Sequence, residues 1–221
     1  MHVYKNISLI GSSHISEESI RQVKEGFSNI RPEIVAVELD NGRANGLFEK
    51  KKPNKLFLLK ALGLGGFLFY IIGEFIQKKL GKFVNIDPGS EMKTALVLAK
   101  ENNASVFLID REIQVTLRRF SKFFKKRELI KMILDLFFGK KEKIDFDLRK
   151  VPSEKVIDFA ISEIKKKYPS IYKVLIEERD RYMSQRLYGL TIAFPDKKIM
   201  AVVGAGHIKG ILENLKRLET Q

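Results

Sequence analysis

The sequence contains no cysteine and no tryptophan, and only three histidines among its 221 residues. Without cysteine there can be no disulfide bond, thiolate metal site or cysteine nucleophile. An apolar, strand-like pattern begins almost at the first residue, so we expect no signal peptide. The uncharged run at residues 61–73 is also too short to span a bilayer comfortably, which takes about 20 residues.

Positive charge dominates, with a formal net charge of +14 that is concentrated between residues 118 and 167. Such an excess favours an acidic partner, whether an anionic lipid surface, an acidic protein or nucleic acid. It is equally consistent with a lysine-rich surface that only maintains solubility. Since 44% of the residues are hydrophobic, the chain can bury a full core, and we expect a single domain over residues 1–221.

Two of the three histidines occupy the same position in a repeated pattern. An apolar run at residues 7–10 leads into Gly-x-x-His at 11–14, and another at residues 200–203 leads into Gly-x-x-His at 204–207. In both places a helix-like segment follows. A histidine placed after a strand and a glycine-containing turn is where side chains meet ligands. Alternatively, one histidine caps its helix and the other is a satisfied core residue.

The apolar segments predict an α/β fold, with tandem strand-helix-strand repeats forming a central mixed sheet flanked by helices. We expect strands at residues 3–10, 34–37 and 105–109 and a last strand before His207. Ser16 and Ser90 are expected to cap helices, and residues 40–42 to form a polar turn. The short strand-helix-strand unit at the N-terminus implies parallel pairing of its two strands.

Residues 56–82 are expected to form an apolar helical insertion, most apolar at 56–76. Three interpretations remain for it: a buried helical hairpin, a surface for self-association, or a segment that touches a membrane. We favour self-association or core packing, and therefore expect a homodimer or larger homo-oligomer. A second, basic helical region is expected at residues 113–190, where the spacing indicates inward-facing Val156, Phe159, Ala160 and Ile164.

The predicted strands end at His14, Glu38, Asp110 and His207, and parallel strands present their carboxyl ends at one edge of a sheet. Two imidazoles and two carboxylates there indicate a divalent-metal site. Oxygen-rich ligation suits Mn²⁺, Co²⁺ or Zn²⁺, and without a thiolate the preference for Zn²⁺ is not strong. Glu38 is either a ligand or the general base. A metal would acidify a bound water and polarise a carbonyl, which predicts hydrolysis.

Further charged residues are candidates for the same site. Arg111 or Arg118 could neutralise an oxyanion. Glu91 lies in the first turn of a predicted helix, where it could simply complement the helix dipole. Glu178 and Arg179 continue the apolar stripe of their helix, so they form either a structural ion pair or part of the site.

Six motifs, in the same order along the chain, resemble the TraB family, which includes the PrgY and animal Tiki proteins. They lie at residues 11–19, 32–39, 89–92, 108–119, 178–183 and 203–207, and archaeal members are the most similar. The resemblance implies a fold shared with erythromycin esterases and a metal-dependent hydrolase. Tiki proteins are proteases that need Mn²⁺ or Co²⁺ and both Gly-x-x-His motifs. By position, His14 and His207 match the motif histidines, and Glu38 matches a family carboxylate. Asp110, Arg111, Arg118, Glu178 and Arg179 match positions without an assigned role.

The leading hypothesis is thus a metal-dependent peptidase acting on a peptide or protein substrate. The rival is a regulatory or peptide-binding protein at a membrane surface that uses the same residues without turnover. Nucleic-acid binding rests on charge alone, and we do not expect it. Many archaeal relatives continue into a membrane-spanning C-terminal region, so we expect a cytoplasmic or membrane-associated location.

Overall fold

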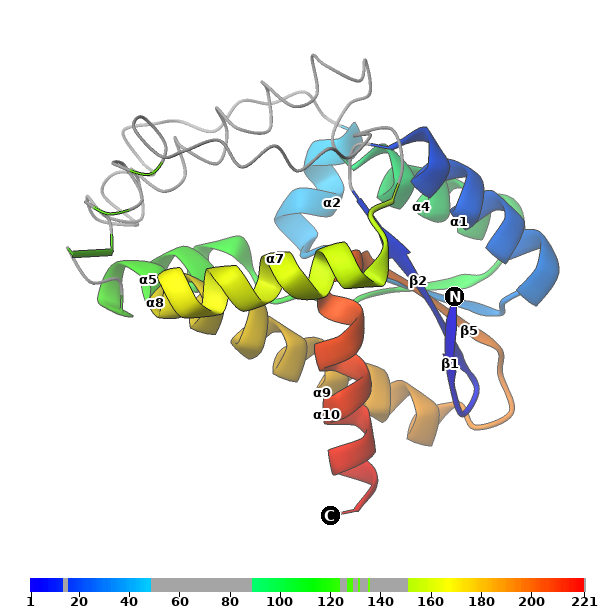
Figure 1. Cartoon of the computed structure of the whole chain (residues 1–221). Coiled ribbons are helices and arrows are strands. Elements are labelled where there is room, and N and C mark those ends of the chain that lie inside the picture. The colour runs from blue at the N-terminus through cyan, green and yellow to red at the C-terminus, as the bar shows by residue number, and fades with distance from the viewer. Residues whose placement is uncertain are drawn as a thin grey trace.

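The computed structural model describes residues 1–13, 16–48, 89–123, 127, 128, 131, 135 and 151–220. Within them, a central sheet has the strand order β1-β2-β5-β3-β4 (Figure 1). Its strands are β1 His2–Tyr4, β2 Ile7–Ser12, β3 Ile34–Val37, β4 Ser105–Leu108 and β5 Ile199–Gly204. Strands β2, β5, β3 and β4 run parallel to one another, and β1 is antiparallel to β2. The predicted α/β fold with a mixed sheet is therefore confirmed.

The sheet separates two hydrophobic cores, and the alternating side chains of β5 belong to both. Ile199, Ala201 and Val203 face one core, whereas Met200 and Val202 face the other. This is the period of two that a strand imposes, and every residue of β5 is buried. A strand covered on both faces is the expected setting for a continuous apolar run.

Helices cover both faces of the sheet (Figure 1). The helices α1 Glu17–Ile30 and α4 Ser90–Glu101 pack on the core that contains Val202. On the opposite face, α9 Glu178–Ala193 and α10 Ile208–Glu219 pack on the core that contains Val203. The remaining helices are α2 Asn41–Phe48, α5 Ile113–Phe123, α7 Glu154–Lys167 and α8 Pro169–Tyr172, with a π-helix, η1 Lys173–Glu177, and a 3-10 turn, η2 Ala205–His207.

The strand predicted at residues 3–10 is in fact a hairpin of β1 and β2. Lys5, at the turn, has a φ of 49°, a left-handed conformation that is uncommon for a residue with a side chain. The Asn6 side chain donates hydrogen bonds to the carbonyl oxygens of Phe194 and Lys197, both at 2.8 Å. These bonds hold the turn against the loop before β5.

Three local predictions were wrong. Residues 40–42 begin α2 rather than a turn, because Asp40 accepts the backbone N–H of Arg43 at 2.9 Å and so caps the helix. Gly89, with a φ of 86°, is the N-cap of α4, and Ser90 is its first residue. Phe159 points outward and is 51% exposed. By contrast, Ser16 caps α1 as predicted, accepting the backbone N–H of Ser19 at 3.0 Å.

The two strands of the N-terminal strand-helix-strand unit are parallel, as expected, but they do not pair with each other. Strand β5 lies between them, with Val202 opposite Ile10 on one side and opposite Val37 on the other. The carboxyl end of β5, which leads to His207, therefore lies between the carboxyl ends of β2 and β3. The sequence pattern predicts that these two ends are adjacent.

Some predictions fall outside the described residues, namely His14, the insertion at residues 56–82 and much of the segment that follows α5. Elsewhere in the predicted helical region 113–190, the described parts are largely helical. None of the helices that the structure describes has both the length and the apolar character needed to cross a membrane.

Candidate functional site

The ends of three parallel strands bring Glu38, Asp110 and His207 together. Glu38 follows β3 directly, and its backbone N–H donates to the carbonyl of Val202 in β5 at 3.0 Å. In return, the backbone N–H of Gly204 donates to Oε2 of Glu38 at 2.6 Å. The Glu38 side chain is thus held across the end of β5, and both it and His207 are buried. The structure confirms that these residues meet at one edge of the sheet.

The guanidinium of Arg179, from α9, lies at the centre of this group. Its Nη2 donates to Oδ2 of Asp110 at 2.6 Å and also to Oε1 of Glu38. Its Nη1 lies 3.0 Å from Nε2 of His207. Burial alone would lower the pKa of Arg179, but Glu38 and Asp110 outweigh burial and raise it. Arg179 therefore remains a cation that joins both carboxylates to the histidine.

These contacts fix the proton on His207. An arginine can only donate hydrogen bonds, so Nε2 of His207 must accept from Arg179. Nδ1 of His207 then carries the proton and donates it to Oδ1 of Asp180 at 2.5 Å. A carboxylate behind the ring holds the imidazole in one tautomer and one orientation. The lone pair of Nε2 consequently faces the guanidinium of Arg179, and Oε1 of Glu38 lies 3.5 Å from the same nitrogen.

A π-helical turn places these residues. The π-helix η1 ends at Glu177, and α9 begins with the consecutive residues Glu178, Arg179 and Asp180. A π-turn adds one residue to the helix and shifts the face of everything that follows. Asp180 is thereby buried beneath His207, whereas Glu178 turns toward α5. Burial raises the pKa of Asp180, and the hydrogen bond from His207 only partly offsets it.

Asp110 is held between two arginines. Besides Arg179, it accepts a hydrogen bond from Nη2 of Arg43, whose Nε donates to Asp40 at 2.7 Å. Burial would raise the pKa of Asp110, but Arg179 and Arg43 outweigh it, and the pKa is lowered. Asp110 does not cap the next helix, since α5 begins three residues later and Asp40, not Asp110, accepts the N–H of Ile113.

Glu178 belongs to a neighbouring ion cluster. Arg119 binds both of its oxygens, at 2.6 and 2.7 Å, and Nη1 of Arg111 donates to it at 2.9 Å. Burial acts to raise the pKa of Glu178, but these two arginines lower it overall. Arg111 is further fixed by Thr116 and by the carbonyl of Val174. Of the two interpretations left open by the sequence, Glu178 fits the structural ion cluster and Arg179 fits the site.

The other two candidates are Glu91 and Arg118. Glu91 is 1% exposed, far from the surface role suggested by its helix position, and it accepts the hydroxyl of Ser12 at 3.4 Å. It therefore lies beside the end of β2, next to the first Gly-x-x-His turn. Arg118 is exposed on α5, and the arginine that binds Glu178 is its neighbour Arg119.

The described residues offer two donor atoms that a metal ion could share, Nε2 of His207 and Oε1 of Glu38. The carboxylate of Asp180 supports them from behind, as is usual for a metal-binding histidine. No set of three or more histidine, aspartate or glutamate side chains in the described part of the chain is arranged to hold a metal. His14 lies outside that part. Arg179 contacts both donors, so they bind a guanidinium in this structure.

Sequence reasoning missed Asp180, Arg43 and Asp40 as members of the cluster. The sequence did contain a signal for Asp180. It lies three residues before Met183 and four before Ser184 on α9, which places it on the same buried face of the helix. Counting instead from Val174, at the regular helical period, selects Glu178. For Asp40 and Arg43 the sequence shows the spacing of a capped helix start, which the polar run at residues 40–42 hides because it also resembles a turn.

Comparison with known proteins gives consistent results. The chain is 39% identical to an uncharacterized protein of Methanocaldococcus jannaschii, an alignment that covers 97% of this chain and 54% of that protein. It is 24% identical to the TraB domain-containing proteins of Bos taurus and Homo sapiens, over 94% of this chain and 62% of theirs. The chain thus spans between about half and two thirds of the length of these relatives. Residues 4–221 match the TraB/PrgY/gumN family. With motifs, strand ends and overall match in agreement, the chain belongs to the TraB/PrgY/gumN family.

Proposed function

We propose that this domain is a metal-dependent hydrolase that cleaves peptide bonds at the end of β5. The observation that carries the proposal is that His207 lies between two carboxylates, with Asp180 at Nδ1 and Glu38 near Nε2. Asp180 holds the proton of His207 on Nδ1, so Nε2 is unprotonated, and Oε1 of Glu38 lies 3.5 Å from it. An oriented imidazole beside a buried carboxylate is a common basis for metal ligation or for proton transfer to and from a water.

Glu38 and His207 would hold the metal, with His14 as the further donor indicated by the sequence. Mn²⁺ or Co²⁺, once bound, would lower the pKa of a water and polarise a carbonyl. Glu38 is fixed by the Gly204 N–H at one oxygen and directs the other toward His207. Because the Nε2 lone pair cannot accept from Arg179 and bind a metal at the same time, the Arg179 contact must open when metal is present. Arg179 would then be free to neutralise charge on a substrate oxygen.

The peptide bond is proposed as the substrate through the resemblance of the chain to the Tiki proteins. The family match itself is broader and leaves the substrate open. Any activity of the longer relatives that depends on the part this chain does not span is a separate proposal.

The three histidines allow a matched experiment. His14→Ala, His207→Ala and His2→Ala are compared with the unmodified chain for bound Mn²⁺ by elemental analysis and for cleavage of a fluorogenic peptide library. His2 pairs with Glu154 on the surface and is the control for metal binding. We expect the first two variants to lose metal and cleavage and His2→Ala to keep its metal. Full activity in both His14→Ala and His207→Ala would refute the proposal.

A second candidate is a non-catalytic protein that binds peptides at a membrane surface. It is favoured by Arg179, which already neutralises both Glu38 and Asp110, and by the net charge of +14. Measurable peptide binding, with the peptide intact after long incubation with Mn²⁺, would select this candidate. Self-association through residues 56–82 remains a prediction, to be checked by light scattering over a range of concentrations.

A further inference from the structure

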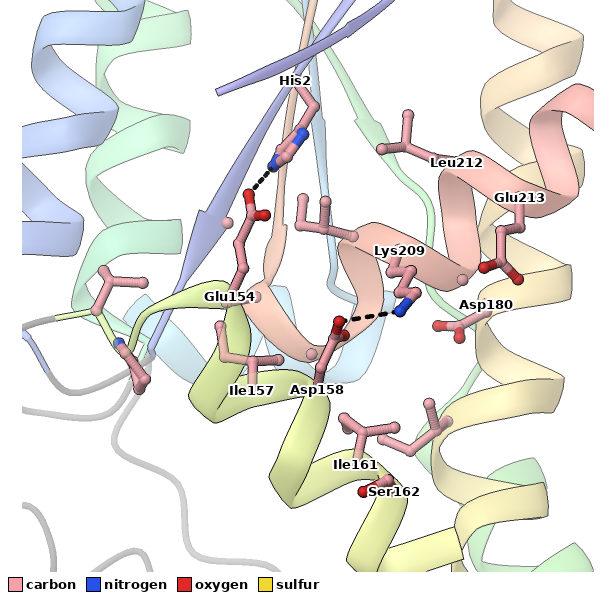
Figure 2. A pocket seen from close by; sticks show the side chains of 18 of the residues that line it. His2, Glu154, Ile157, Asp158, Ile161, Ser162, Asp180, Lys209, Leu212 and Glu213 are labelled. Atoms are coloured by element: carbon pink, nitrogen blue, oxygen red, sulfur yellow. Dashed lines mark hydrogen bonds and ion pairs between the residues drawn. The ribbon is translucent and has the colours of Figure 1, made fainter. Parts of the chain in front are cut away.

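A cavity of about 720 Å³ lies beside the candidate site, bounded mainly by α7 and α10 (Figure 2). Its volume falls within the roughly 300–1000 Å³ of typical ligand pockets. The end of β2 at Gly11 and the η2 turn at Ala205 and Gly206 also line it. It is therefore formed in part by the backbone of both glycine-containing turns.

Part of the cavity wall is apolar. This part is formed by Ile157 and Ile161 from α7, by Ile176 from η1, and by Ile208 and Leu212 from α10. A Cβ added to Gly206 would be 3.4 Å from Cδ1 of Ile161, so a side chain there would reach toward α7. Glycine at this position keeps the space between the η2 turn and α7 open.

The charged side chains around the cavity are mostly acidic, although the chain as a whole is strongly basic. Four carboxylates line it, from Glu154, Asp158, Asp180 and Glu213, against the two ammonium groups of Lys165 and Lys209. Lys209 pairs with Asp158 at 2.9 Å, and His2 lies 3.3 Å from Glu154 (Figure 2).

Glu213 is an exposed residue among those lining the cavity, and Lys209, which also lines it, precedes Glu213 by about one turn of α10. Since Lys209 already pairs with Asp158, Glu213 is available to receive a cation that enters with a ligand.

The cavity communicates with the candidate site through Asp180. Asp180 lines the cavity and at the same time accepts the Nδ1 proton of His207. A ligand in the cavity would therefore lie on the Asp180 side of the imidazole, opposite Glu38. Any displacement of Asp180 by that ligand would be passed on to the orientation of His207.

We propose that this cavity binds an apolar peptide segment that carries a positive charge, with the apolar side chains between α7 and α10 and the cation at Glu213. The inference rests on the proposed function in taking that peptide as the substrate of the adjacent site. The cation is either a free peptide α-ammonium or a lysine or arginine side chain, and the probes below distinguish the two.

Binding is measured by calorimetry on the full chain without metal, so that no turnover is required. The probes are Leu-Leu-Gly amide with a free amino terminus, acetyl-Leu-Leu-Lys amide, and acetyl-Leu-Leu-Glu amide. At least one cationic probe should bind about tenfold or more tightly than the acidic probe. The tighter of the two cationic probes identifies the source of the charge. Equal binding of the acidic probe would overturn the proposal.

Two variants test the location. Ile161→Trp fills the cavity, and Glu213→Lys reverses the charge at its mouth; both should weaken the cationic probe by about tenfold or more. The matched controls are Phe159→Trp, at an exposed position of α7, and Glu163→Lys, whose carboxylate pairs with Lys167 on the same helix. Neither control residue lines the cavity. Circular dichroism verifies folding, and Glu213→Lys, being a surface change, keeps the test decisive if Ile161→Trp does not fold.

The outcomes separate this inference from the proposed function. Charge-selective binding that the cavity variants abolish, with no cleavage in Mn²⁺, would support the cavity and refute the hydrolase. Cleavage with binding that is unaffected by Ile161→Trp and Glu213→Lys would refute the cavity and leave the hydrolase standing.

Discussion

A Cβ added to Gly210 would lie 2.0 Å from Oδ2 of Asp180, so the backbone of α10 packs directly on the carboxylate that holds His207. Only a residue without a side chain permits this approach. Gly210 follows His207 by three residues, and the same chain segment thus supplies both the imidazole and the surface that positions its partner. The position of Asp180 is determined from two sides.

Gly210→Ala should destabilise the protein and disturb His207. Alanine would force Asp180 to move, and overpacking of this kind costs about 1–3 kcal/mol in the free energy of unfolding. Chemical denaturation measures the cost, and ¹⁵N NMR of the imidazole reports on His207. Gly189→Ala is the control, because a Cβ there meets no atom within 4 Å. It should be neutral or stabilising by up to about 1 kcal/mol, since alanine favours a helix. Equal effects of the two changes would contradict the packing argument.

Asp180→Asn should change the tautomer of His207. The amide can donate to Nδ1, and the ring proton would then move to Nε2, facing the Arg179 guanidinium, which has no acceptor. We expect ¹⁵N shifts to show a larger share of the Nε2-protonated form and the contact with Arg179 to loosen. Asp158→Asn, on the cavity wall and paired with Lys209, should leave the His207 spectrum unchanged. An unaltered tautomer in Asp180→Asn would show that Asp180 does not set it.

Arg179→Met should destabilise the chain strongly in the absence of metal. Removing one member of a buried ion pair leaves uncompensated charge and typically costs about 3–5 kcal/mol. If Glu38 and His207 hold a metal, added Mn²⁺ should raise the melting temperature of this variant more than that of the unmodified chain. Arg119→Met is the control, because its side chain is 43% exposed and Glu178 keeps Arg111. If added Mn²⁺ does not change the melting temperature of Arg179→Met, the result would count against the metal proposal.

Glu178→Gln should change the pH dependence of stability. The pKa of Glu178 is lowered below its ordinary value of 4.5, so its stabilisation is fully present above that pH and is lost as the pH falls through the lowered value. The difference in free energy of unfolding between the unmodified chain and Glu178→Gln should thus be largest above pH 4.5 and shrink in more acidic solution. Glu25→Gln, at an exposed pair with Arg21, should differ by less than about 1 kcal/mol. A difference that grows on acidification would contradict the assignment.

Sequence alone could locate the strands and the residues at their ends, although β4, whose apolar run indicates a buried strand, is partly exposed. The runs before Glu38 and Asp110 are short, apolar and followed by charge, which is sufficient to predict that both carboxylates lie at the same edge. It could not give the order of the strands, because a sheet is assembled by pairings between distant segments. The hairpin at Lys5 was missed for a local reason, since this turn contains neither glycine nor proline.

The partners of the site residues were harder to predict than the residues themselves. Helical periodicity assumes a constant 3.6 residues per turn, and one π-turn before Glu178 is enough to exchange the roles of neighbouring side chains. Arg43 could not be assigned to Asp110 either, because the two come from segments that the sequence pattern treats separately. Such contacts depend on how different helices and strands pack together. The periodicity of a single helix or strand does not predict this packing.

The placement of β5 between β2 and β3 also has a consequence for biosynthesis. Ile199 pairs with both Ile7 and Ile34, so the middle of the sheet is supplied by a strand that is synthesised long after both of its neighbours. A nascent chain that has not reached this point carries two apolar strands with no shared neighbour, and pairings across so much sequence form slowly. We therefore expect the ribosome-bound polypeptide to depend on chaperones until β5 and α10 have emerged.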